Sequence, residues 1–96
     1  MPTATTLHIV NQSPYSSNAL QRCLNALSSL DGVLLIEDAV YGSQILANAL
    51  TGKDVRGYIL MADQQARNHM AEGLTTIDYD RFVTLCCEYN KTLSWF

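Results

Sequence analysis

The chain has 96 residues, of which 48 % are hydrophobic and 16 % are charged, and its formal net charge is −3 at pH 7. This length predicts one domain spanning residues 1–96, and a charged fraction below the usual ~25 % indicates that another chain covers part of the surface. The six Lys and Arg residues are scattered, which argues against direct nucleic-acid binding. No apolar run approaches the ~20 residues that span a bilayer, and the start Met1-Pro2-Thr3-Ala4 lacks the basic flank of a signal peptide. We therefore expect a soluble, cytoplasmic protein with no membrane partner.

Short apolar runs alternate with helical periods along the whole chain. The apolar runs predict strands at residues 7–10, 33–36, 57–61, 74–77 and 92–96. Spacings of three and four residues predict helices at about 18–30, 41–50, 64–70 and 82–89. Asp31-Gly32 is expected to close the first helix, with Gly32 in the left-handed conformation. This alternation predicts a single α/β domain with a mostly parallel four- or five-stranded sheet and helices on both faces.

Three aspartates, Asp38, Asp63 and Asp78, each follow an apolar strand. One interpretation is that each caps the next helix by accepting free backbone N–H groups. The alternative is an acidic cluster at the carboxyl edge of the sheet, where Glu37 with Asp38 and Asp63 would form a phospho-receiver or metal site. A receiver needs its acidic pair after the first strand, where this chain has Asn11-Gln12-Ser13, so capping is favoured.

The histidines carry no catalytic motif. His8 lies inside a predicted strand, which favours a hydrogen-bonded structural role, and His69 lies near the end of a short helix, where a cation suits the dipole. No serine, histidine and acid form a hydrolase motif, and no Cys/His spacing resembles a zinc site. We expect neither a metal nor an organic cofactor, and whether the chain is an enzyme stays open.

The three cysteines are the remaining candidates for chemistry. An odd count that includes the adjacent pair Cys86-Cys87 argues against a disulfide framework. Cys86 falls on the apolar face of the fourth predicted helix, whereas Cys87 points away from it. Cys23 lies in the first predicted helix, where Leu20, Leu24 and Leu27 favour burial and an inert thiol, but the helix start and Arg22 would favour a thiolate at the surface.

The order of several segments resembles the DsrH/TusB family of sulfur-relay subunits over nearly the whole chain. The segments that carry the resemblance are residues 7–15 (LHIVNQSPY), residues 33–41 (VLLIEDAVY), Tyr58-Ile59-Leu60 with Asp63, Ala66 and Arg67, and residues 77–83 (IDYDRFV) through Trp95. Members usually have Gly where this chain has Asn68, and Asn is the next best residue for a left-handed helix end.

The resemblance implies a DsrE/DsrF/DsrH-like α/β fold and a heterohexamer with two related sulfur-relay subunits. Such complexes pass persulfide sulfur between cysteines of upstream and downstream carrier proteins in the cytoplasm, for 2-thiolation of the tRNA wobble uridine or for dissimilatory sulfur oxidation. The indispensable cysteine is expected on a sister subunit. Cys23 matches the first-helix cysteine of the sulfur-oxidation type, which makes it the candidate persulfide carrier, whereas Cys86 and Cys87 match no family site. The alternatives are a non-catalytic structural or regulatory subunit and, from another class, a phospho-receiver-like module.

Overall fold

The structure, a computed structural model, describes residues 5–69 and 72–96, which form an alternating series of strands and helices. In chain order these are β1 (Thr6–Val10), α1 (Ala19–Asn25), β2 (Gly32–Leu35), the 3₁₀ helix η1 (Glu37–Gly42), α2 (Ser43–Leu50), β3 (Arg56–Leu60), α3 (Met61–Ala66), β4 (Thr75–Ile77), α4 (Tyr79–Glu88) and β5 (Lys91–Trp95). The strands form one five-stranded sheet in the order β4-β3-β2-β1-β5, and every neighbouring pair is parallel. The predicted α/β class with a parallel sheet is confirmed.

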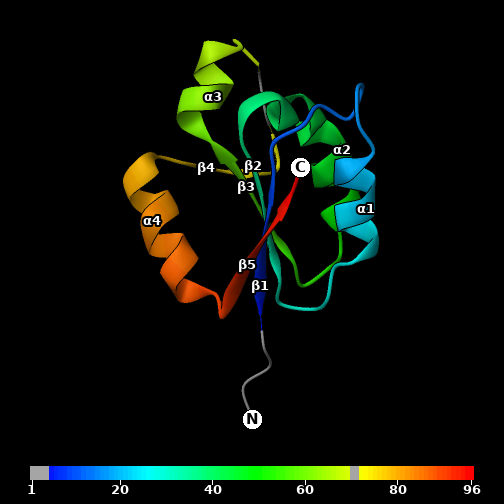
Figure 1. Cartoon of the computed structure of the whole chain (residues 1–96), viewed down its shortest axis with the longest axis vertical. Coiled ribbons are helices and arrows are strands. Elements are labelled where there is room, and N and C mark those ends of the chain that lie inside the picture. Colours follow the sequence, from blue (N-terminus) through cyan, green and yellow to red (C-terminus); the bar gives the residue numbers. More distant parts are fainter. Residues whose placement is uncertain (1–4, 70–71) are drawn as a thin grey trace.

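Helices cover both faces of the sheet because alternate strand residues point to opposite sides. In Figure 1, α1 and α2 lie on one side of the sheet, α4 lies on the other, and α3 lies beyond one end of the strands. The α1/α2 side buries Val10, Val33, Leu35 and Ile59 against the helices. The α4 side buries a second group of strand residues, Leu7, Ile9, Leu34, Tyr58, Leu60 and Ile77, with Leu85 of α4. The core therefore consists of two apolar layers separated by the sheet.

The chain order places a topological switch beside β1. The first four strands run outward from β1 to β4, and the chain then returns along α4 to add β5 on the other side of β1. Parallel α/β sheets bind ligands at such a reversal, outside the carboxyl ends of the strands. β5 is an edge strand, and four of its five residues are exposed. The end of β5 therefore lies at the position where this fold class usually places its site.

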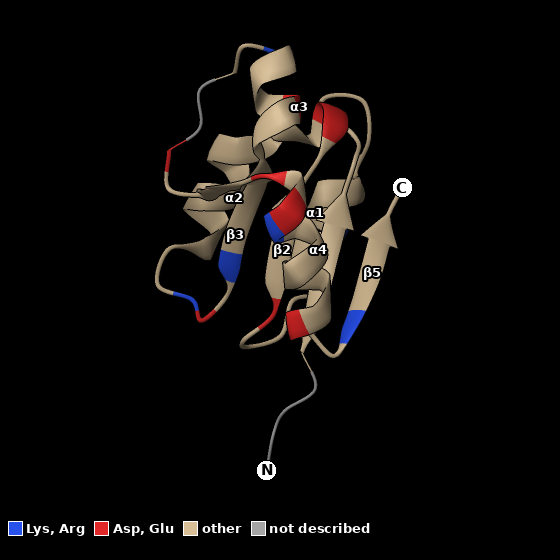
Figure 2. Cartoon of the chain, turned by 90° about the vertical axis from the view of Figure 1, so that its left-hand side faces the viewer, with Lys and Arg blue, Asp and Glu red and all other residues tan. Residues whose placement is uncertain are grey.

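The surface contains several large apolar side chains and few charges. Figure 2, which views the molecule from the side of α4, shows only scattered charged positions along the ribbon. Apolar side chains that are more than half exposed include Tyr15, Leu30, Tyr79, Val83 and Phe96. None of the helices in the described part of the chain has the length and apolar character needed to cross a bilayer.

The first helix is shorter than predicted. α1 ends at Asn25, and the left-handed residue before β2 is Leu30, with φ 71°, rather than Gly32. The backbone N–H of Leu30 donates to the carbonyl of Asp54 at 2.7 Å, which holds this conformation. Gly32 begins β2, where a Cβ atom would lie 2.3 Å from the hydroxyl oxygen of Tyr89. The prediction that Asp31-Gly32 closes a helix is wrong because both residues serve tertiary contacts.

The two middle helices differ from the prediction at their starts, since α2 begins two residues later and α3 three residues earlier. Residues 37–42 form η1 ahead of α2, and α3 occupies Met61–Ala66 instead of residues 64–70. Met70, like residues 1–4 at the start of the chain, lies outside the described residues. Asn68 has φ 48°, which confirms the left-handed conformation predicted for it.

Capping by the three aspartates is confirmed at one position and wrong at two. The Asp78 carboxylate accepts a hydrogen bond from the backbone N–H of Arg81 at 2.8 Å and caps α4. Asp38 lies inside η1, and Asp63 lies inside α3 with its carboxylate bound to the backbone N–H of Glu37. These two side chains link different elements instead of capping their own helices.

Replacement of Asp78 tests the cap. We expect Asp78→Ala to lower the free energy of unfolding by ~1 kcal/mol and Asp78→Asn to lower it less, because Asn also accepts the capping bond. Chemical denaturation measures both. Asp80→Ala removes the same charge from the first turn of α4, so an equal loss there would assign the effect to the helix dipole and not to the cap.

Candidate functional site

Cys23 lies in α1, the helix that follows β1, and its side chain is fully buried. It belongs to the apolar layer between α1, α2 and the sheet, together with Leu20 and Val10. Burial, with the nearby carboxylate of Asp31, raises the pKa of the Cys23 thiol to about 12. The thiolate is the reactive form of cysteine, so in this conformation Cys23 is a protonated core thiol.

The other two cysteines lie on α4, on the opposite side of the sheet from α1 (Figure 1). All three thiols are free. Cys86 is half-buried, and burial raises its pKa, whereas Cys87 is exposed. Both positions agree with the helical spacing of the sequence.

A chain of hydrogen bonds joins the first strand to the last one. His8 and Asp31 are almost fully buried, and the Nε2 atom of His8 lies 2.9 Å from the carboxylate of Asp31. The indole N–H of Trp95 donates to the Nδ1 atom of His8 at 3.0 Å. Because an indole nitrogen can only donate, Nδ1 accepts, which makes His8 the neutral tautomer that donates from Nε2 to Asp31. The predicted hydrogen-bonded, structural role of His8 is confirmed.

Asp31 connects these side-chain hydrogen bonds to the backbone. Its carboxylate accepts from the N–H of Thr6 and from the N–H of Ser28, each at 3.0 Å. Burial alone would raise the pKa of Asp31, but the hydrogen bonds from His8, Ser28 and Thr6 outweigh it and lower the pKa below its ordinary value. The charged form of Asp31 is thus the one that the fold stabilises.

The hydrogen bonds among Trp95, His8 and Asp31 lie along a cavity of about 290 Å³ between the end of α1 and β5. His8, Asp31, Trp95 and Ala26 line it, and Ala26 follows Cys23 by three residues. The Arg22 guanidinium carbon lies 5.9 Å from the centre of the Trp95 ring. The half-buried indole is therefore held between α1 and β1, and it packs against the layer that contains Cys23.

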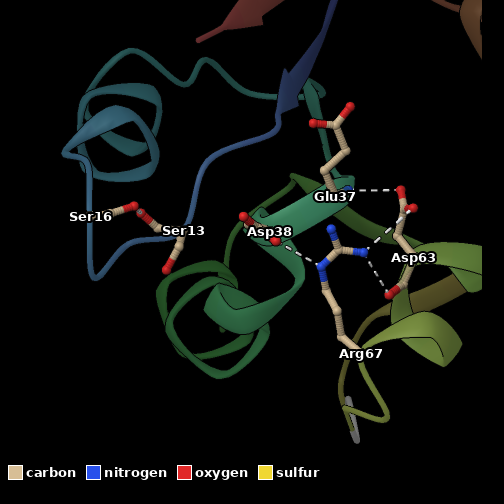
Figure 3. A network of polar contacts seen from close by, with 6 residues as sticks. All are labelled: Ser13, Ser16, Glu37, Asp38, Asp63 and Arg67. Atoms are coloured by element: carbon tan, nitrogen blue, oxygen red, sulfur yellow. Dashed lines mark hydrogen bonds and ion pairs between the residues drawn. The ribbon is translucent and has the colours of Figure 1, made fainter.

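A second polar group lies at the carboxyl edge of the sheet (Figure 3). The backbone N–H of Glu37, whose φ is 50°, donates to the carboxylate of Asp63 at 2.8 Å. The Nε atom of Arg67 donates to Asp38 at 2.9 Å, and an Nη atom of the same side chain donates to the backbone carbonyl of Asp63 at 3.3 Å. Arg67 thus joins α3 to η1, and its bond to Asp38 raises the pKa of the guanidinium.

This arrangement does not support the phospho-receiver interpretation. Figure 3 shows the guanidinium of Arg67 between Asp38 and Asp63, with the carboxylate of Glu37 pointing away from it. A cation therefore already occupies the place that a metal ion would need. Within residues 5–69 and 72–96, no three His, Cys, Asp or Glu side chains gather as a metal-binding group.

His69 has a different role from the one predicted. α3 ends at Ala66, and the imidazole Nε2 of His69 lies 3.0 Å from the hydroxyl of Ser43. Its ring also meets the edge of Tyr41, at 5.4 Å between centroids. The prediction of a helix-dipole contact is wrong because the residue turns back onto the start of α2.

Sequence reasoning missed Asp31, Trp95 and Arg67 as network members. Asp31 precedes a glycine, which is typical of a turn, and Trp95 lies 87 residues from its partner His8. Arg67 stands out in the sequence only as one of the residues that carry the family resemblance. A buried histidine in a strand was the one available signal, because both of its nitrogens require partners.

The comparisons with known proteins point to one family. A family model described as "DsrH like protein" matches residues 12–92 of the chain. The chain is also similar to the protein named "Protein TusB" of Pectobacterium parmentieri, with 30 % identity over 96 residues, 93 % of this chain and 99 % of the relative. Both matches cover the elements that carry Cys23, Asp31 and Arg67.

Acid is expected to destabilise the protein through Asp31. Its pKa is lowered in the folded state from the ordinary 3.8, so its stabilisation is complete above that value and is lost as the pH falls through the folded pKa. Urea unfolding between pH 7 and pH 2.5 measures this loss. Asp31→Asn should remove this contribution to the pH dependence and cost ~1–3 kcal/mol at pH 7, because its buried partners lose a charged acceptor.

Asp54→Asn is the matched control, since it removes the same charge from an exposed position at the same end of the sheet. An equal change in the pH dependence of both variants would contradict the assignment to Asp31.

Proposed function

The chain belongs to the DsrH family, and we propose that it is a subunit of a cytoplasmic sulfur-relay complex with related subunits as its partners. Membership over almost the whole chain is the observation that carries this proposal. In such a complex, sulfur passes as a persulfide when a thiolate attacks the terminal sulfur of a donor persulfide and releases the donor thiolate. That step needs an accessible thiolate and no metal or organic cofactor.

The surface of the chain supports a role in assembly. Tyr79 and Val83 lie one turn apart on α4 and are 59 % and 68 % exposed, and Phe96 is 70 % exposed. Aromatic side chains such as Tyr79 and Phe96 are enriched at the centres of protein interfaces. Trp95, which precedes Phe96, is bound within the chain by His8. We therefore propose that Phe96 and the outer face of α4 meet the partner subunits.

The role of Cys23 depends on its exposure. While the side chain is buried, the pKa of about 12 leaves almost no thiolate of Cys23 at neutral pH. The essential thiol is then on a partner subunit, and this chain is structural. Cys23 becomes a persulfide carrier only if the complex or the donor opens the layer that covers it.

Two destinations for the sulfur follow from two observations. The relative named TusB favours 2-thiolation of the wobble uridine in tRNA. The presence of Cys23 favours dissimilatory sulfur oxidation, because the family resemblance places a cysteine there in that branch. We take tRNA thiolation as the first candidate, and the amount of 2-thiouridine in tRNA from a strain lacking this chain separates the two.

Assembly tests the function directly. We expect the isolated chain to self-associate, and its two related subunits to convert it into a defined hetero-oligomer, because apolar side chains on its surface need cover. Light scattering coupled to size exclusion measures both states. Val83→Glu should weaken the complex, and Thr84→Glu, at the exposed neighbouring position, should weaken it less. A stable monomer that ignores its related subunits would contradict the proposal.

Sulfur loading tests Cys23. Donor-treated complex is digested, and each cysteine peptide is weighed for one additional sulfur. If Cys23 is a carrier, Cys23→Ser abolishes loading on this chain, and Cys86→Ser and Cys87→Ser leave it intact. Sulfur on Cys87, or on no cysteine of this chain, would remove the carrier role and leave the structural one.

A further inference from the structure

We propose that the end of β5 is a movable closure over the buried position of Cys23, and that the hydrogen bonds from Trp95 to His8 and from His8 to Asp31 hold it shut. This inference goes beyond the proposed function, because it concerns opening of the chain itself and requires no sulfur transfer.

The position of β5 makes it suited to local opening. It is the outermost strand on its side of the sheet, its ladder partner is β1 alone, and four of its five residues are exposed. Segments with few buried apolar contacts and exposed backbone hydrogen bonds open at lower free energy than the core. Trp95 is the one half-buried residue of β5, so it carries most of the attachment of this strand to the α1/α2 layer.

The side chain of Trp95 lies where it can control access to Cys23. It packs against the layer that contains Cys23, and with His8, Asp31 and Ala26 it lines the cavity beneath α1. Ala26, which lines the cavity, donates its backbone N–H to the carbonyl of Cys23 at 2.9 Å, so the cavity lies against the turn of α1 that carries the thiol. Movement of the indole would therefore extend the existing cavity of about 290 Å³ toward Cys23 without unfolding the central strands.

Two contacts specify the closed position of the indole. Its N–H donates to Nδ1 of His8 at 3.0 Å, and the two rings lie side by side with 24° between their planes. Arg22 approaches the ring from α1 at 5.9 Å. The His8 imidazole is itself fixed by its bond to Asp31 at 2.9 Å. His8 and Asp31 are thus positioning residues for Trp95.

The test measures labelling of Cys23 in a Cys86→Ser/Cys87→Ser background, so that Cys23 is the one thiol. The alkylation rate is followed at fixed pH in increasing low concentrations of urea. Local opening of β5 predicts a rate with a much weaker urea dependence than global unfolding, because little surface is exposed. A rate that rises with the full urea dependence of global unfolding would overturn the proposal with no further variant needed.

Two variants test whether the hydrogen bonds from Trp95 to His8 and from His8 to Asp31 keep β5 closed. Trp95→Phe keeps an aromatic ring but loses the donor, and His8→Gln keeps a donor for Asp31 but moves its acceptor, the amide oxygen, away from the Nδ1 position that Trp95 binds. Each should accelerate labelling at least tenfold in the absence of urea, and the double variant should be no faster than the faster single one, because both remove the same bond. The matched control Ser94→Ala, which alters an exposed residue of β5 next to Trp95, should stay within twofold.

Multiplicative effects of Trp95→Phe and His8→Gln, or an equal acceleration by Ser94→Ala, would show that these hydrogen bonds do not hold β5 closed. The labelling result does not depend on whether this chain takes part in sulfur transfer. Labelling through local opening without persulfide on Cys23 would support the closure and remove only the carrier role. A chain that binds its related subunits but labels only by global unfolding would overturn the closure and leave the proposed membership of the complex.

Discussion

The buried carboxylate of Asp31 is the constraint on which the edge of this fold depends. A charge removed from water is costly unless hydrogen bonds replace its hydration. Here the replacements come from Thr6 and His8 of β1 and from Ser28 after α1. Through His8 the same group reaches Trp95 of β5. One acidic side chain thus fixes where the first strand begins, how the chain leaves α1, and where the last strand is anchored.

The same carboxylate also affects the chemistry available to Cys23. Burial is the main cause of the raised pKa of Cys23, and the negative charge of Asp31 raises it further because it disfavours a second negative charge. Stability of the closed fold and reactivity of this cysteine are therefore opposed. Reactivity requires solvent to enter, which restores hydration of the thiolate and screens Asp31. The edge strand β5 is the element whose movement admits solvent at the least cost to the two apolar layers.

The local elements could be predicted from the sequence because their signals are local. The apolar run at residues 7–10 and the three- and four-residue spacing around Cys23 identify a strand and a helix without knowledge of their neighbours. The left-handed conformation of Asn68 and the cap at Asp78 follow from short-range chemistry in the same way. The proposed function depends on the family resemblance, because neither composition nor spacing indicates it.

The tertiary partners could not be predicted in this way. The sequence predicts that Asp31 closes the first helix together with Gly32, since nothing near it in sequence indicates that its carboxylate is buried against His8. Asp38 was interpreted as a cap, because its partner Arg67 lies 29 residues away. The sequence alone does not decide whether Cys23 is reactive, because the exposure of its thiol depends on packing against distant parts of the chain.

The two polar networks also divide the surface between fixed and available regions. Arg67 forms ion pairs with Asp38 and Asp63 at the carboxyl edge and connects α3 to η1. Neither of these carboxylates is therefore free to bind a cation. Exposed apolar side chains lie on α4, at Tyr79 and Val83, and beyond β5, at Phe96. Apolar surface binds other proteins and supplies no group for acid–base or metal chemistry. In the proposed complex, sulfur chemistry at this chain would therefore use a thiol that a partner brings, the exposed Cys87, or Cys23 after β5 moves.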